Sequence, residues 1–168
     1  MAKRKTWRMT GMDDYVAYVE RLAENGEEIL GEAVYEMAKV VADRVRANIE
    51  ALPTVTNAAN IAMYKQGRSK LSDEEKKGLL DGFGVSAMQN DNGYINVKLG
   101  FDGYNSVKTK KYPKGQPNAL IARVTESGSG YRTKTPFIRP AVRATKKTAE
   151  QAGQVKIDDR IAALGKKK

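Results

Sequence analysis

The sequence contains neither cysteine nor histidine. Without cysteine there are no disulfides, no thiolate nucleophile and no Cys-based zinc site. Without histidine the chain lacks the usual general base near neutral pH, a common metal ligand and every Ser-His or Cys-His nucleophile pair. Carboxylate-bound magnesium remains compatible with these absences, but no acidic cluster suggests it. We therefore expect no enzyme activity, no cofactor and no metal site.

Long apolar runs are also missing, since none approaches the ~20 residues that span a membrane. The basic residues Lys3, Arg4 and Lys5 are not followed by the apolar stretch of a secretory signal. We expect the chain to be made in a cytoplasm, to remain there until it assembles, and to have no membrane partner.

Charge is abundant and unevenly placed. The chain has 30 basic and 20 acidic residues and a net charge of +10. Seven basic residues lie near the ends: Lys3, Arg4, Lys5, Arg8, Lys166, Lys167 and Lys168. We expect one domain, residues 1–168, with basic flexible termini at about residues 1–5 and 165–168. Solvated tails are one interpretation of these ends, and nucleic-acid contact is the other.

Apolar periodicity predicts two helices in the first third of the chain. The first, with a stripe from Met12 to Ala23, is expected to stop at Asn25-Gly26. The second is expected over residues 27–51 and to end before Pro53, with a wide apolar face. That face contains Leu30, Val34, Met37, Val41, Val45 and Ile49. Ahead of both helices, residues 6–9 favour a short strand in which Trp7 covers the core.

The middle of the chain shows weaker patterns. Residues 54–70 predict a long loop or a weakly ordered helix. Ser72 with Glu75 forms a capping-box pattern at the start of a short helix. Asp91-Asn92-Gly93 predicts a hairpin turn, followed by a strand that alternates over residues 94–101.

Residues 102–117 predict a second long loop, which is rich in lysine. Tyr104 and Tyr112 lie among these lysines, so one interpretation is a loop that follows a phosphate backbone and stacks on bases. The other is a solvated, flexible loop. The candidate residues for a DNA channel or an inter-subunit contact are Lys108, Lys110, Lys111 and Lys114.

The last third of the chain predicts a long helix after a short ambiguous element. Asn118 is a candidate cap for a segment that suits a helix or a strand. Pro140 is tolerable only near the start of the final helix, which is expected to run to about residue 164. Its thin stripe of small residues favours packing against a sheet or a partner helix: Val142, Ala149, Ala152, Val155 and Ile161.

Five segments, taken together and in this order, resemble the neck or head–tail joining proteins of long-tailed phages, the gene-product-ten family. They are residues 10–15 (Thr-Gly-Met-Asp-Asp-Tyr), 79–86 (Leu-Leu-Asp through Gly-Val-Ser), 97–104, 126–128 (Glu-Ser-Gly) and 136–141 (Pro-Phe-Ile-Arg-Pro-Ala). The last is the most specific. In the fourth, Ser129 stands where the family usually has Thr, and residues 58–70 are longer than the family pattern suggests.

The resemblance implies a small α+β domain, in which long helices pack on a small antiparallel sheet with a β-hairpin and long loops. It implies a virion protein, made in the infected bacterium, that forms a ring around the DNA path, with a hexamer favoured and a dodecamer possible. Its neighbours would be the connector, adaptor or stopper proteins and the tail-terminator or tail-tube proteins, with genomic DNA passing without sequence specificity. No catalysis is implied. Candidate packing and interface residues are Trp7, Pro136, Phe137, Arg139 and Pro140.

Two other functions remain open. A tail-terminator or tail-completion ring is the nearest variant of the neck assignment. A stand-alone basic nucleic-acid-binding protein is a different class, and it predicts tight binding to free duplex with a steep salt dependence. A neck channel predicts weak binding or none, because DNA must slide through it.

Overall fold

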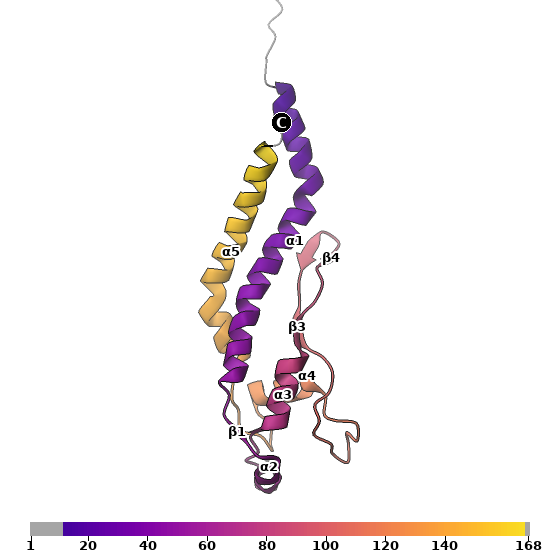
Figure 1. Ribbon diagram of the computed structural model, residues 1–168, viewed down its shortest axis with the longest axis vertical. Helices are drawn as coiled ribbons and strands as arrows, with labels where there is room; N and C mark the ends of the chain where they lie inside the picture. The colour runs from indigo at the N-terminus through magenta and orange to yellow at the C-terminus, as the bar shows by residue number, and fades with distance from the viewer. Residues whose placement is uncertain (1–11, 167–168) are drawn as a thin grey trace, which may run out of the picture.

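The protein has an elongated α+β fold. The computed structural model describes residues 12–166 and contains, within them, five helices and three two-stranded sheets. The long helices α1 (Met12–Glu50) and α5 (Ile138–Lys166) lie side by side and form an arm (Figure 1). At the lower end of this arm lies a second part of the molecule, here called the base. It is formed by α2 (Asn57–Tyr64), α3 (Asp73–Gly82), α4 (Asn118–Ser127) and the loop 102–117 (Figure 1).

Helix α1 is continuous, so the expected break at Asn25-Gly26 is wrong. The Asn25 side chain donates a hydrogen bond to the Arg21 carbonyl, 2.7 Å away, and so fits within the helix. A glycine inside a helix costs only about 1 kcal/mol relative to alanine. Packing along α5 offsets that cost, and ion pairs join the two helices at Arg160–Glu28 (2.6 Å) and Lys156–Glu32 (3.1 Å).

Small residues let the two arm helices approach closely. Ala33 of α1 and Ala149 of α5 are buried, and a Cβ added at Gly153 would lie 2.7 Å from the Met37 side chain. The small-residue stripe therefore packs against a partner helix, which was one of the two predicted alternatives. Three assignments to apolar faces were wrong, because Leu30 of α1 and both Val142 and Val155 of α5 are exposed.

The strands are short and form pairs. The strand β1 (Thr54–Val55) lies parallel to β2 (Leu71–Ser72), which the antiparallel expectation missed. The antiparallel pairs are β3 (Phe83–Val85) with β6 (Leu99–Phe101), and β4 (Gln89–Asp91) with β5 (Tyr94–Asn96). Between β1 and β2 lies α2, so residues 54–70 include the helix that was one predicted alternative.

The hairpin turn is confirmed, because Asn92 and Gly93 join β4 to β5 with φ of 56° and 89°. The single strand expected over residues 94–101 is instead interrupted after β5. The pairs Val85↔Leu99 and Gln89↔Asn96 leave three residues between them on one strand and two on the other. This is the geometry of a β-bulge, which bends the ladder and which side-chain alternation does not reveal.

The core lies where the lower end of the arm meets the base. It is formed by buried residues from four helices and the sheet, among them Val45, Ile49, Leu79, Ile121 and Phe137. The Phe137 ring packs edge-on against Phe101 of β6, with centroids 6.0 Å apart. Phe137, one of the candidate packing residues, is thus a core residue that links the start of α5 to β6.

Local capping signals were partly correct. The capping box of α3 is present, with both Ser72–Glu75 hydrogen bonds formed. The segment after Pro117 is a helix, but Asn118 is not its cap. Instead Asn118 is the first residue of α4, and its amide donates to the Asp102 carbonyl at 2.8 Å.

Glu126 at the end of α4 holds the start of α5. Its carboxylate accepts hydrogen bonds from the backbone N–H groups of Phe137 (2.7 Å), Ile138 (2.8 Å) and Arg139 (3.0 Å). The next residue, Pro140, has no N–H to satisfy, as its expected place near the helix start requires. Burial alone raises the pKa of Glu126, but the hydrogen bonds outweigh it and lower the pKa below its ordinary value of 4.5.

The two ends of the chain bear on the predicted tails. Helix α5 runs through Gly165 and Lys166, so the expected C-terminal tail at residue 165 begins too early. Residues 1–11 and 167–168, which include the predicted strand 6–9 and Trp7, lie outside the described residues.

We predict that Glu126→Ala lowers the free energy of unfolding by about 2–3 kcal/mol, because it leaves the N–H groups at the start of α5 without their charged acceptor. Glu126→Gln keeps an acceptor oxygen and should cost less. Urea denaturation measures both. The control Glu150→Ala removes an exposed carboxylate 4.0 Å from Lys146 and should change stability by less than about 0.5 kcal/mol. Equal losses for Glu126→Ala and the control would contradict the assignment.

The lowered pKa of Glu126 also predicts a pH dependence. A carboxyl group with a depressed pKa contributes stability above its unfolded value, 4.5, and that contribution disappears as the pH falls through the folded pKa. The stability difference between wild type and Glu126→Gln should therefore be full near neutral pH and shrink below pH 4.5. Urea titrations at several pH values measure this difference, and a gap that stays constant on acidification would refute the prediction.

Candidate functional site: a lysine-walled cavity

The base contains a cavity of about 680 Å³. Three walls enclose it: α2 on one side, the loop 102–117 on another, and α4 with the segment 129–132 behind. This size is in the range of ordinary ligand and peptide sites. It combines apolar, aromatic and basic side chains.

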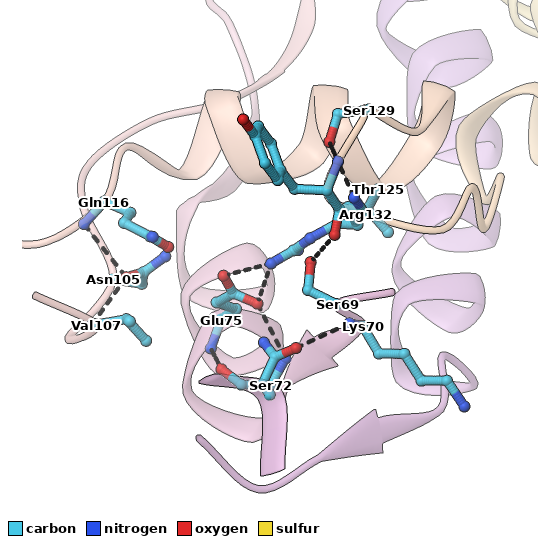
Figure 2. Close-up of polar contacts among 12 residues, drawn as sticks. Ser69, Lys70, Ser72, Glu75, Asn105, Val107, Gln116, Thr125, Ser129 and Arg132 are labelled. Carbon is cyan, nitrogen blue, oxygen red and sulfur yellow. Dashed lines mark hydrogen bonds and ion pairs between the residues drawn. The ribbon is translucent and has the colours of Figure 1, made fainter. Parts of the chain in front are cut away.

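The floor of the cavity is a buried ion pair between α3 and the segment after α4. The Arg132 guanidinium donates to both oxygens of Glu75, at 2.7 and 2.8 Å, and also to the Thr125 hydroxyl at 3.3 Å (Figure 2). The side chains are only 9% and 3% exposed. Both bonds to Glu75 come from the single nitrogen Nη2, while Nη1 donates to Thr125, so the desolvated guanidinium is held from two sides.

Backbone contacts continue this floor towards α2. The Ser69 hydroxyl donates to the Tyr131 carbonyl at 2.6 Å (Figure 2), and the Ser69 N–H donates to the same carbonyl at 2.9 Å. The Thr133 N–H donates back to the Ser69 carbonyl at 3.2 Å. The adjacent Lys70 N–H donates to the Asn60 side chain of α2 at 2.8 Å. Thus α2, α3 and the segment 129–133 form one connected frame.

Internal hydrogen bonds hold the loop 102–117, which carries the lysines, in a defined conformation. The buried Asn105 side chain accepts from Val107 N–H at 2.9 Å, and Asn105 N–H donates to the Gln116 carbonyl at 3.0 Å. Farther out, Thr109 and Tyr112 exchange backbone hydrogen bonds of 3.1 and 3.0 Å across the tip. Hydrogen bonds therefore hold the loop both where its two ends meet and at its tip.

Three of the four candidate lysines line the cavity. These are Lys108, Lys110 and Lys111, whereas Lys114 is exposed but lies outside the lining. Within residues 12–166 none of the four forms an ion pair, although the Lys111 ammonium lies 5.5 Å from the Tyr112 ring centroid. Their positive charges are available to a binding partner.

The α2 side of the cavity carries exposed aromatic and apolar side chains, next to Lys65. Tyr64 of α2 stacks on Tyr131, with ring centroids 4.9 Å apart and planes 18° from parallel. Both tyrosines remain more than half exposed, and Ile61, one turn before Tyr64, is 66% exposed. The cavity thus presents an apolar edge and a basic edge.

The charge of the lining favours an acidic partner. It contains five basic side chains, which include Lys65 and Arg132, and one acidic side chain, Glu75, already paired. The lining therefore suits a ligand with negative charge on one side and apolar groups on the other. Among the described residues no cluster of three or more metal-ligating side chains occurs.

Residues 136–141, the last of the five segments, lie at the junction of α4 and α5 and not in the cavity. Phe137 is buried, and Pro136 and Pro140 flank the start of α5 beside Glu126. The Arg139 side chain is 64% exposed, with Nε 3.8 Å from the Glu126 carboxylate of the same chain. Contact of Arg139 with a neighbouring subunit stays a prediction.

Sequence reasoning missed the ion pair and the aromatic rim. Glu75 was recognised only as a cap, and no local pattern links it to Arg132, 57 positions away. Tyr64 and Tyr131 are also distant in sequence and carry no shared motif. Their one visible signal is that both are large aromatic residues.

Comparison with known proteins gave no relatives: no family model, no curated protein and no solved structure matches this chain. Within the described residues no helix is long and apolar enough to cross a membrane.

We predict that Arg132→Ala lowers the free energy of unfolding by about 3–5 kcal/mol, because it leaves the buried Glu75 carboxylate without its partner. The double variant Glu75→Gln/Arg132→Ala should lose less than the sum of the two single variants, because no unpaired charge remains. Chemical denaturation of the four proteins measures the coupling. Lys110→Ala, an exposed lysine of the same cavity, is the control and should be nearly neutral, while strict additivity at the pair would contradict the prediction.

Proposed function

We propose that this protein is a structural subunit of a phage neck, a ring that surrounds the DNA path between the capsid portal and the tail. The proposal starts from the five ordered segments that resemble the head–tail joining family. Two of them, residues 126–128 and 136–141, contact each other through Glu126. The tail-terminator ring remains the nearest variant, because it would use the same kind of assembly.

The observation that carries the proposal is the apolar helical surface that no described segment covers. Large apolar side chains on both helices of the arm are 44–64% exposed, and those of residues 12–19 lie on one face of α1. On α1 they are Met12, Tyr15, Val16, Val19, Leu30 and Tyr35, and on α5 they are Val142 and Val155. Contiguous exposed apolar surface marks protein interaction sites. A subunit that packs against its copies in a ring would bury it.

The short strands point the same way. Each described sheet has two strands, so every strand leaves one edge unpaired. Isolated two-stranded sheets are marginal in water, and open edges are sites for added strands. A neighbouring subunit would cover the apolar surface of the arm and also pair with an open strand edge.

A stand-alone nucleic-acid-binding protein is the second candidate, favoured by the unpaired lysines beside two exposed tyrosines. Stacking aromatics and a basic groove are what single-stranded nucleic acids use. This candidate predicts binding by a monomer or dimer with a steep salt dependence, whereas a sliding channel predicts the reverse.

We predict that the purified full chain forms a closed ring, with six copies favoured, and that the ring binds free duplex weakly. Light scattering at two salt concentrations, with and without duplex DNA, gives the mass, and electron microscopy shows whether the assembly is a ring with a central hole. Tight, salt-sensitive duplex binding by a monomer or dimer would refute the neck proposal.

A matched pair of variants separates the two candidates. Lys108→Gln/Lys110→Gln/Lys111→Gln neutralises the cavity wall, and Lys98→Gln/Lys146→Gln/Lys147→Gln removes the same charge elsewhere. If DNA binding is the function, only the first variant should abolish it. If the chain is a neck subunit, both variants should bind duplex as weakly as wild type.

A further inference from the structure

We infer that the acidic start of α1, residues 12–24, of one copy docks into the lysine-walled cavity of the next copy. The inference rests on the proposed ring and names the contact that builds it. The occupant of the cavity is a second copy of this chain.

The start of α1 carries the anchors of a helix that binds in a groove. Met12, Tyr15, Val16 and Val19 follow the i, i+3, i+4, i+7 spacing of one helical face. Their side chains are 47%, 64%, 46% and 44% exposed. Exposure of such a stripe to water is unfavourable. The apolar rim formed by Ile61, Tyr64 and Tyr131 offers a matching surface.

Charge on this helix complements the cavity. Residues 12–24 contain Asp13, Asp14, Glu20 and Glu24 against one base, Arg21. None of the four acids forms an ion pair with a described residue. The cavity lining has the opposite balance, five basic side chains to one acidic. Opposite charges arranged around an apolar centre select the partner and its register.

The two surfaces lie too far apart to meet within one chain. The start of α1 is at one end of the elongated molecule, and α2 with the lysine loop is at the other (Figure 1). Helix α1 has 39 residues, so its ends are about 60 Å apart at 1.5 Å per residue. The contact must therefore join two copies through different surfaces, and repetition of such a heterologous contact produces a ring when the rotation between copies closes.

An acidic, apolar helix uses more of this cavity than a nucleic acid would. Phosphates would contact the lysines, but the exposed Ile61 on the α2 side would remain without a partner. At about 100° per residue, Glu20 and Asp13 are the carboxylates nearest the face of Tyr15 and Val16, so this side of the helix can contact both edges. The volume of about 680 Å³ suits the side chains of one helix face, with the helix itself resting on the rim.

Charge reversal on each side tests the contact in the full-length protein. One variant is Asp13→Lys/Asp14→Lys/Glu20→Lys, the other is Lys108→Glu/Lys110→Glu/Lys111→Glu, and a third carries both sets. All six side chains are exposed, and circular dichroism confirms that each variant folds. The control Lys98→Glu/Lys146→Glu/Lys147→Glu reverses three exposed lysines away from the cavity.

Each single-sided variant should weaken self-association by at least about tenfold in light scattering. Assembly should return in the variant with both sets and in an equal mixture of the two single-sided variants, where every contact is again between opposite charges. The control should assemble as wild type does.

The outcomes separate this contact from the ring itself. A ring that forms in all variants would overturn the contact and leave the neck proposal standing. A dimer that obeys the charge-swap pattern would keep the contact, as a reciprocal exchange, and refute the ring. A wild-type chain that stays monomeric at every concentration tested would overturn both, and duplex binding lost on lysine reversal without rescue would assign the cavity to nucleic acid instead.

Discussion

The carboxylate of Glu126 is the contact on which the arrangement of the arm depends. It accepts from Phe137, Ile138 and Arg139, and the following Pro140 has no N–H, so the first turn of α5 leaves no donor unsatisfied. The same contact seats the Phe137 ring against β6. A 29-residue helix is thereby fixed at one end, and close packing at Gly153 and ion pairs to Glu28 and Glu32 hold the rest of it along α1.

At the cavity, the carboxylate of Glu75 likewise has more than one structural role. Glu75 closes the capping box of α3 through Ser72 and also receives the Arg132 guanidinium. Because both oxygens are satisfied inside the base, the acid is not available to the lysines above it. The ion pair therefore makes a rigid floor and leaves the wall of Lys108, Lys110 and Lys111 with uncompensated charge, which is what gives the cavity its preference for an acidic partner.

The sequence predicted features with a short-range cause and missed those that depend on distant neighbours. The Ser72 capping box and the turn at Asn92-Gly93 follow from residues within one turn of each other, and both were confirmed. The break at Gly26 was wrong because α5, more than a hundred residues later, stabilises the helix through that position. The Arg132–Glu75 floor and the Tyr64–Tyr131 rim have no local signal, so the lysines were found but not the cavity they line.

Helix α1 carries a column of glutamates at every fourth position from 20 to 36, on adjoining turns of one face. Like charges at this spacing repel by roughly 0.2–0.5 kcal/mol per pair. Helix α5 offsets the repulsion only in the middle, where Arg160 and Lys156 reach Glu28 and Glu32. Towards the start of α1 the repulsion remains, beside apolar side chains that are equally uncovered. Charge repulsion and exposed apolar side chains both make this end of α1 unfavourable in water. A contact with the lysine-walled cavity would relieve both, because the cavity supplies positive charge and an apolar rim.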